Sequence, residues 1–209
     1  MRLKFKNPQF AKDIHQSKLF SKEKLTEVSL IMEEGKCYPE DFEELAKLKH
    51  LEHLYVDHDG AVDFAFFSPL TQLCALDVGT MDCAYCIPAV INLRALQSLT
   101  RLESLEIRDF INIDVDGIGT LTQLKELFIT FGGRIHHIEQ IAELPFLRYL
   151  SLCDTIHKNL DFLQLLSPDV ELDLNFVEVE EDIDIRIIQR FTNRSCEDIT
   201  INGKTYEKI

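Results

Sequence analysis

The stretch Leu121-Thr-Gln-Leu124-Lys-Glu-Leu127-Phe-Ile129 decides how this sequence folds. Its apolar residues first recur every three positions, at Leu121, Leu124 and Leu127, and then after two positions, at Ile129. A three-residue spacing suits a 3₁₀ or helical segment, and a two-residue spacing suits a strand, whose side chains alternate between its faces. The stretch therefore predicts a return segment, a turn and a short strand with one buried side.

The same pattern, with apolar residues at positions i, i+3 and i+5, recurs along the chain. With Leu124 as position i of its repeat, seven repeats start at residues 25, 51, 73, 102, 124, 147 and 169, although Asp169 is not apolar. The starts lie 22 or 23 residues apart, except for the intervals 25–51 and 73–102. A unit of this kind cannot bury its apolar side alone, so the repeats must stack on one another.

The L-x-x-L-x-L cores, such as Leu124-Lys-Glu-Leu127-Phe-Ile129, resemble those of leucine-rich-repeat proteins. The spacing near 22 is most similar to the short-repeat bacterial internalin or SDS22-like type, and the resemblance covers residues 25–176. It implies an α/β solenoid, a curved horseshoe of about seven irregular repeats with parallel strands on its concave face. The family usually has Asn or Cys at i+8, bonded to the backbone of the turn. Here i+8 holds neither, so we expect irregular turns.

The two ends of the stack must be closed, because an open terminal repeat would expose core residues. We expect residues 1–24 to form an N-terminal cap, residues 25–176 the repeats, and residues 177–209 a C-terminal cap, all in one continuous domain. The C-terminal cap should contain a short helix within residues 181–191. It should also contain a hairpin with Asn202-Gly203 in a type I′ turn.

The two long intervals are each expected to carry a longer return helix. Pro39 can occupy a first helical turn, where its missing N–H costs nothing. Residues 88–98 are rich in good helix formers and predict a second helix.

The charge excludes some classes of partner. The chain has 36 acidic and 22 basic residues, a formal net charge of −14. A duplex nucleic-acid binder needs a surplus of Lys and Arg, and an anionic membrane surface also attracts basic proteins, so neither is an expected partner. No signal-peptide pattern or membrane-spanning run is visible, and the six cysteines fit reduced thiols. The sequence therefore predicts a cytoplasmic protein.

The predicted strands point positions i+2, i+4 and i+6 to the concave surface, with i+7 at its edge. Nine of these 28 positions are acidic, and only Arg108 is Lys or Arg. The whole-chain composition would place about 5 acids and about 3 bases there, so the shortage of bases is the clearer signal. Aromatic residues, which often anchor interfaces, lie between the acids. The candidate partner-binding residues are Tyr55, Asp57, Asp77, Glu106, Arg108, Asp109, Glu126, Phe128, Phe131, Tyr149, Asp154, Glu171, Asp173 and Phe176.

These residues predict a non-enzymatic module that binds a basic protein and is steered to it electrostatically. The concrete hypothesis is an immunity-type inhibitor that masks a toxin or nuclease. One alternative is a scaffold, or a substrate-recruiting adaptor or effector, that relies on the aromatic residues. A second alternative is an enzyme with an unrecognised carboxylate site. A further possibility is that the acids are solvated strand residues and the aromatics fill gaps.

The sequence predicts no catalytic residue, metal site or cofactor. Cys83 and Cys86 form a C-x-x-C, but no second pair follows for a zinc site. Residues 112–117 begin like a calcium loop, yet Gln123 stands where the bidentate Glu belongs, so a turn between repeats is expected. His136 and His137 are interpreted as an exposed loop pair.

Overall fold

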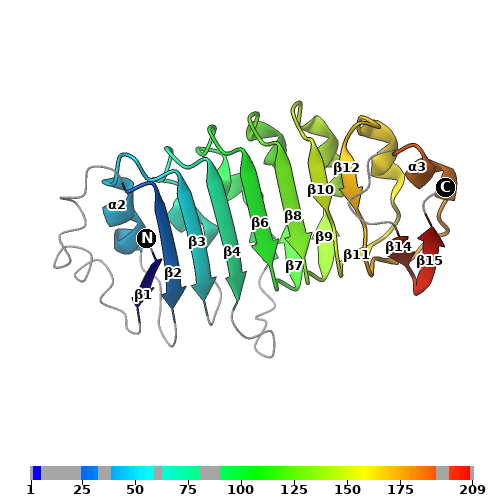
Figure 1. Ribbon diagram of the computed structural model, residues 1–209, viewed down its shortest axis with the longest axis horizontal. Helices are drawn as coiled ribbons and strands as arrows, with labels where there is room; N and C mark the ends of the chain where they lie inside the picture. Colours follow the sequence, from blue (N-terminus) through cyan, green and yellow to red (C-terminus); the bar gives the residue numbers. More distant parts are fainter. Residues whose placement is uncertain are drawn as a thin grey trace.

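The computed structural model describes residues 2–5, 25–32, 39–58, 63–80, 90–191 and 198–207. Parallel strands follow one another along its long axis, with helices behind them (Figure 1). Within the described residues, the large sheet has eight strands in the order β1-β2-β3-β4-β6-β8-β10-β12. They are β1 (Arg2–Phe5), β2 (Glu27–Met32), β3 (His53–His58), β4 (Ala75–Thr80), β6 (Ser104–Arg108), β8 (Glu126–Thr130), β10 (Tyr149–Ser151) and β12 (Glu171–Asp173).

In the large sheet, each strand from β2 to β12 begins two residues after its repeat starts, as the pattern predicts. The pairing is parallel and in register, so that Leu76 of β4 lies between Leu54 of β3 and Leu105 of β6. The inward positions thereby form continuous rows of Leu, Ile and Val, which are 0–1% exposed from β3 to β8. Burial of each such side chain stabilises the fold by roughly 1.5–3 kcal/mol. The expected parallel-strand solenoid is confirmed.

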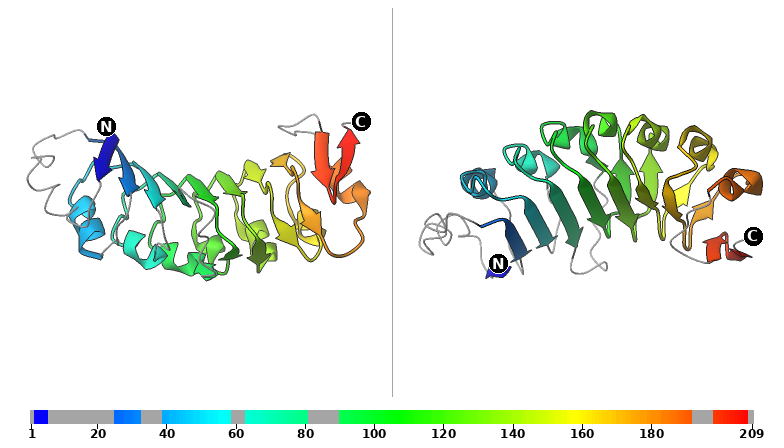
Figure 2. Two further views of the ribbon diagram at one scale, coloured as in Figure 1. Left: turned by 90° about the horizontal axis from the view of Figure 1, so that it is seen from below. Right: turned by 45° about the horizontal axis from the view of Figure 1, so that its top comes forward.

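The chain returns through short helices on the side opposite the large sheet. They are α2 (Pro39–Ala46) and the 3₁₀ helices η2 (Phe64–Phe67), η4 (Leu93–Leu96), η5 (Ile118–Thr120), η6 (Ile138–Glu143) and η7 (Asp161–Leu165). In the left view of Figure 2 both ends of the solenoid bend toward the large sheet, which therefore lines the concave side. Pro39 begins α2, as expected.

The helix expected over residues 88–98 is wrong. The described part of this segment forms a strand, β5 (Val90–Asn92), followed directly by η4. Ile91 pairs with Ile113 of a neighbouring strand, and the Asn92 side chain accepts a bond from Arg94 N–H at 2.8 Å, which begins the 3₁₀ helix. Pairing with the adjacent repeat thus overrides local helix propensity.

A second, smaller sheet was not predicted. It has the order β13-β11-β9-β7-β5 within the described residues. Its further strands are β7 (Asn112–Asp114), β9 (Arg134–His136), β11 (Ile156–His157) and β13 (Glu178–Val179). Its inward positions recur every 22 residues as Ile91, Ile113, Ile135, His157 and Val179, a sequence signal that His157 interrupts.

The turns after β6, β8, β10 and β12 explain how the last four repeats form without Asn at i+8. The i+8 residues Phe110, Gly132, Thr155 and Val177 are buried and fill the core, and among their side chains only that of Thr155 bonds a backbone carbonyl, at Leu152 O (2.9 Å). The preceding residue, i+7, is left-handed in the same four repeats. These residues are Asp109, Phe131, Asp154 and Phe176, with φ of 65°, 51°, 55° and 57°. We call them the left-handed rim. The i+8 positions of the first three repeats lie outside the described residues.

The C-terminal segment contains the expected helix and hairpin, as α3 (Ile185–Gln189), β14 (Asp198–Ile201) and β15 (Lys204–Glu207). Asn202 and Gly203 have φ of 50° and 69°, as a type I′ turn requires. The Asn202 amide also bonds Val179 N (2.7 Å) and Val179 O (2.9 Å), which satisfies the outer edge of the small sheet. At the other end, β1 adds an unpredicted strand beside β2. The rest of the proposed N-terminal cap, including Phe10, Ile14 and Phe20, lies outside the described residues.

His157 is the polar member of the small sheet's inward row and is 1% exposed. Its Nε2 lies 2.8 Å from Thr155 Oγ1, which donates its own proton to Leu152 O, so His157 donates through Nε2. Its Nδ1 then remains unprotonated and has no hydrogen-bond partner among the described residues. Burial, with a smaller contribution from the charge of Arg134, lowers the pKa of His157 to about 4. The folded protein therefore holds this imidazole neutral.

This environment predicts a stability that falls with acidification. Between pH 6.5 and pH 4 the unfolded chain binds a proton at residue 157 that the folded chain does not, so the free energy of unfolding should drop by about 3 kcal/mol. His157→Val, which matches Val179 in the same row, should remove this part of the pH dependence in denaturant melts. The exposed His50→Gln is the control, and an unchanged pH slope in His157→Val would contradict the assignment.

Candidate partner-binding face

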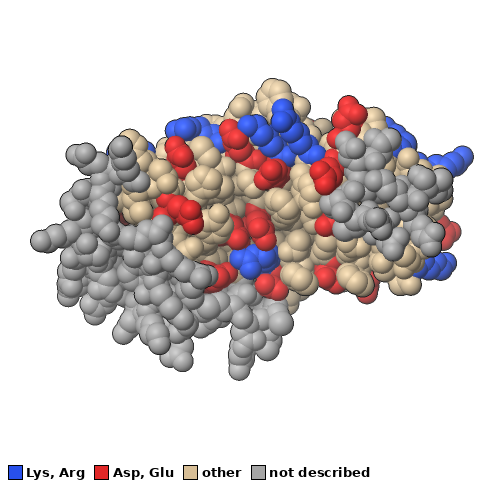
Figure 3. Space-filling view, in the orientation of Figure 1, with Lys and Arg blue, Asp and Glu red and all other residues tan. Residues whose placement is uncertain are grey.

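The concave face consists of the outward positions of the large sheet. Figure 3 shows acidic side chains gathered over the middle of this face, whereas several basic side chains line the upper edge, where the strands begin. In the sequence, Arg101, Lys125 and Arg148 lie within three residues before the starts of β6, β8 and β10. The shortage of bases therefore concerns the interior of the face and not its border.

Arg108 is the centre of the acidic cluster. Its guanidinium donates to Asp77 Oδ1 from Nη2 (2.8 Å) and Nε (3.1 Å), and to Asp57 Oδ1 from Nη2 (3.1 Å). Its Nε also lies 3.2 Å from Glu106 Oε1. Asp109 follows Arg108 in the chain and is influenced by its charge, so four acids lie near one base and the group carries 1 − 4 = −3 when all are ionised. Sequence reasoning placed these residues on one face, but it did not predict that Arg108 binds several of the acids at once.

Gly79 makes this arrangement possible, and sequence reasoning missed it. Asp57, Gly79 and Arg108 occupy position i+6 in three consecutive repeats. A Cβ at residue 79 would lie 3.0 Å from Arg108 Cζ, so the guanidinium lies directly over this glycine. Arg108 reaches across two strand spacings to Asp57 because no side chain stands between them.

Burial changes the titration of the cluster. It raises the pKa of Asp77, although the hydrogen bonds from Arg108 act in the opposite direction. It also raises the pKa of Glu106, and the charge of Asp77 raises that pKa further. Burial likewise raises the pKa of Asp109 and of the Tyr55 hydroxyl, the latter also through Glu27, Asp77 and Glu106. Tyr55 thus belongs electrostatically to this acidic half of the face.

The other half of the face is aromatic. Phe128 and Tyr149 are half-buried and stack with ring centroids 4.9 Å apart, whereas Phe131 and Phe176 at the rim are 62% and 64% exposed. The interpretation of the aromatics as gap fillers therefore fits Phe128 and Tyr149, and it does not fit the two rim residues.

The remaining candidates lie among these aromatics. Glu126 and Asp154 are exposed, and Glu171 and Asp173 are half-buried. Asp173 accepts bonds from Ser151 Oγ (3.4 Å) and Asn175 Nδ2 (2.9 Å), and Ser151 Oγ lies 3.3 Å from Cys153 Sγ. Burial raises the pKa of the Cys153 thiol, which disfavours the reactive thiolate.

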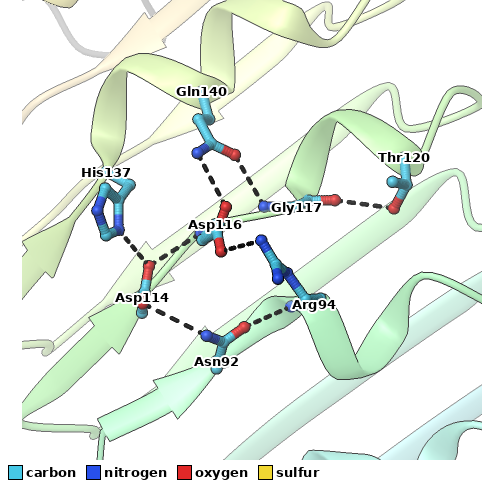
Figure 4. A network of polar contacts seen from close by, with 8 residues as sticks. All are labelled: Asn92, Arg94, Asp114, Asp116, Gly117, Thr120, His137 and Gln140. Carbon is cyan, nitrogen blue, oxygen red and sulfur yellow. Dashed lines mark hydrogen bonds and ion pairs between the residues drawn. The ribbon is translucent and has the colours of Figure 1, made fainter.

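The segment that begins like a calcium loop was expected to be a turn, but its first half, Asn112–Asp114, is strand β7, and the turn is confined to Asp116 and Gly117. Figure 4 shows its two aspartates engaged by protein groups. Asp114 contacts His137 Nδ1 (2.7 Å), Asn92 Nδ2 (3.4 Å) and the Asp116 N–H (3.0 Å). Asp116 binds Arg94 (2.5 Å) and Gln140 (3.0 Å).

Within the described ranges, no group of three or more His, Cys, Asp or Glu residues is arranged to hold a metal. Cys83 and Cys86 lie outside these ranges. Among the described helices, none has the length and apolar character needed to cross a bilayer.

A cavity of about 530 Å³ lies away from the concave face, between the small sheet and the hairpin. It is lined by Arg134, Ile156, Glu178, Val179, Glu180, Asn202 and Gly203. None of the predicted site residues lines it. Small molecules favour cavities, whereas proteins bind broad open faces, so the concave face remains the candidate.

Comparisons with known proteins support the fold. No protein-family model matches the chain, and no curated protein matches it in sequence. Among solved structures, an internalin (inlF) from Listeria monocytogenes is 21% identical with a TM-score of 0.58, over 83% of this chain and 46% of that one. A leucine-rich-repeat protein from Leptospira interrogans is 17% identical with a TM-score of 0.59, over 87% and 44%. The chain thus spans less than half the length of either protein. The leucine-rich-repeat solenoid and its likeness to an internalin are confirmed.

The cluster generates a stability prediction. Arg108→Gln should leave Asp57, Asp77 and Glu106 without their shared cation and lower the free energy of unfolding at pH 7.5 by about 1–2 kcal/mol. Because the folded state then gains by binding protons, this loss should shrink as the pH falls toward 4.5.

Gly79→Val should have the same effect while keeping the arginine, since its side chain would displace the guanidinium. The double variant should cost little more than either single change, as residues acting through one contact are not additive. Additive losses, or a loss that does not depend on pH, would contradict this role for Gly79.

Proposed function

We propose that the chain is a non-enzymatic protein-binding module that docks a basic protein on its concave face. The observation that carries the proposal is the cluster of Asp57, Asp77 and Glu106 bound to Arg108, with Asp109 within reach of the same charge, beside a half of the face with exposed aromatics. Solenoids present such extended concave surfaces to partners.

The two halves of the face suit two steps of binding. A cluster with a net negative charge raises the encounter rate with a basic partner, and this enhancement weakens as the salt concentration increases. Its bonds to Arg108 hold the carboxylates in place before binding, which reduces the ordering cost of association. The aromatic half then supplies the contact area that anchors a complex.

The specific role that we propose is that of an immunity-type inhibitor for a toxin or nuclease. A basic cleft that binds nucleic-acid phosphates would be complementary to a surface of closely spaced carboxylates. By occupying that cleft the chain would exclude the nucleic acid without binding nucleic acid itself. We place this role in the cytoplasm, where reduced cysteines are stable.

A second candidate is a scaffold or substrate-recruiting adaptor, which the exposure of Phe131 and Phe176 favours. Such a partner would be held by aromatic contacts and not by charge. Phe128→Ala or Tyr149→Ala would then weaken binding, while added salt would not.

Site-specific photo-crosslinking tests the location and nature of the partner. A benzophenone side chain at Tyr55, on the concave face, should capture a basic protein from an extract of the source organism. The same group at Phe146, which is 54% exposed in the return segment before β10, is the control. Equal capture from both positions, or capture of acidic proteins at Tyr55, would contradict the proposal.

A double variant that removes two negative charges tests electrostatic steering. Glu106→Gln/Asp109→Asn should lower the association rate with the captured partner about tenfold at low salt and flatten its salt dependence. Asn also tolerates the left-handed backbone at residue 109. The matched control is Glu43→Gln/Glu143→Gln, two exposed acids on return segments. An association rate that the first variant leaves unchanged would rule out steering by this cluster.

A further inference from the structure

The left-handed rim carries two exposed aromatic side chains on an unfavourable backbone. A positive φ is uncommon outside glycine and is an outlier for a bulky residue such as Phe131 or Phe176. Neither ring repays this strain by burial, since both are more than 60% exposed. The left-handed turn buries the i+8 residue that follows each ring, but it does not require a bulky side chain at i+7, where Asn or Gly would be less strained. Exposed rings on such a backbone are typical of sites that contact a ligand.

The rim is also regular. The ladder of backbone bonds continues through it, from Asp109 N to Thr130 O (3.1 Å), from Phe131 N to Cys153 O (3.0 Å) and from Asp154 N to Asn175 O (2.9 Å). A shared backbone conformation in consecutive repeats directs successive side chains alike. Along the solenoid the rim therefore reads acid, aromatic, acid, aromatic.

The spacing of the rim side chains determines which kind of secondary structure in a partner can contact all four of them. Paired strands lie about 4.8 Å apart, so the four side chains stand at about 0, 4.8, 9.6 and 14.4 Å. An α-helix presents residues j, j+3, j+7 and j+10 on one side, at about 0, 4.5, 10.5 and 15 Å. An extended strand presents same-side residues about every 6.8 Å, so its second residue would already lie about 2 Å from the second rim side chain.

We infer that the partner contacts the left-handed rim with one amphipathic α-helix, an inference that rests on the proposed function. Its basic residues, at j and j+7, lie against Asp109 and Asp154. Its apolar residues, at j+3 and j+10, lie against Phe131 and Phe176. The alternation of charge and aromatic side chains on the rim sets this order, because each rim residue then meets a complementary one.

The first test separates binding from folding. Phe131→Asn/Phe176→Asn removes both rings and places a residue that tolerates the left-handed conformation at both positions. The melting temperature should stay the same or rise, while affinity for the protein captured at Tyr55 should fall at least about tenfold. Phe146→Asn/Leu165→Asn, at two exposed return-segment positions, is the matched control and should leave affinity unchanged. Unchanged affinity in the rim variant would overturn the inference and leave the proposed concave-face function standing.

The second test needs no natural partner. The probe is a lactam-bridged helical peptide in an Ala/Gln background with Arg at positions 1 and 8 and Leu at positions 4 and 11. Added at millimolar concentration, it should shift the backbone NMR signals of the rim and of the i+8 residues that follow it. A control peptide of equal composition, with the four residues at every second position and thus spread around the helix, should not. Equal shifts from both peptides, shifts confined to other surfaces, no shifts, or self-association of the chain through the rim would overturn the inference.

Discussion

The structure depends on one constraint: no repeat can bury its own apolar side, so each strand must pair in register with the next. Rows such as Leu54, Leu76 and Leu105 form only because every concave strand occupies the same place in its repeat. The same register also determines which outward-facing residues of neighbouring strands lie side by side. It places Asp57, Gly79 and Arg108 in one row, and the cluster on the concave face follows from that placement.

The turn that follows each concave strand from β6 to β12 is the second consequence of this stacking. Filling i+8 with core residues such as Phe110 and Val177 removes the side chains that could bond the turn, and the preceding residue becomes left-handed instead. The same solution projects Phe131 and Phe176 into solvent. One departure from the usual repeat thus supplies both a buried contact and the exposed edge to which we assign partner binding.

The strands, their register and the type I′ hairpin could be predicted because apolar spacing and Asn-Gly act locally. The small sheet was missed because its strands are only two or three residues long and His157 interrupts the row. Residues 88–98 were mistaken for a helix because pairing of Ile91 with Ile113 is a tertiary effect. The candidate face was predicted position by position, but the role of Gly79 required knowing which side chain crosses it.

The measurement that tests the central claim most directly is NMR cross-saturation of the perdeuterated chain bound to its captured partner. If the concave face is the binding surface, saturation should transfer mainly to amides near Tyr55, around Glu106 to Asp109, and around Phe128 to Phe131. Transfer confined to the return segments η2 to η7, or to the cavity beside Asn202, would contradict it.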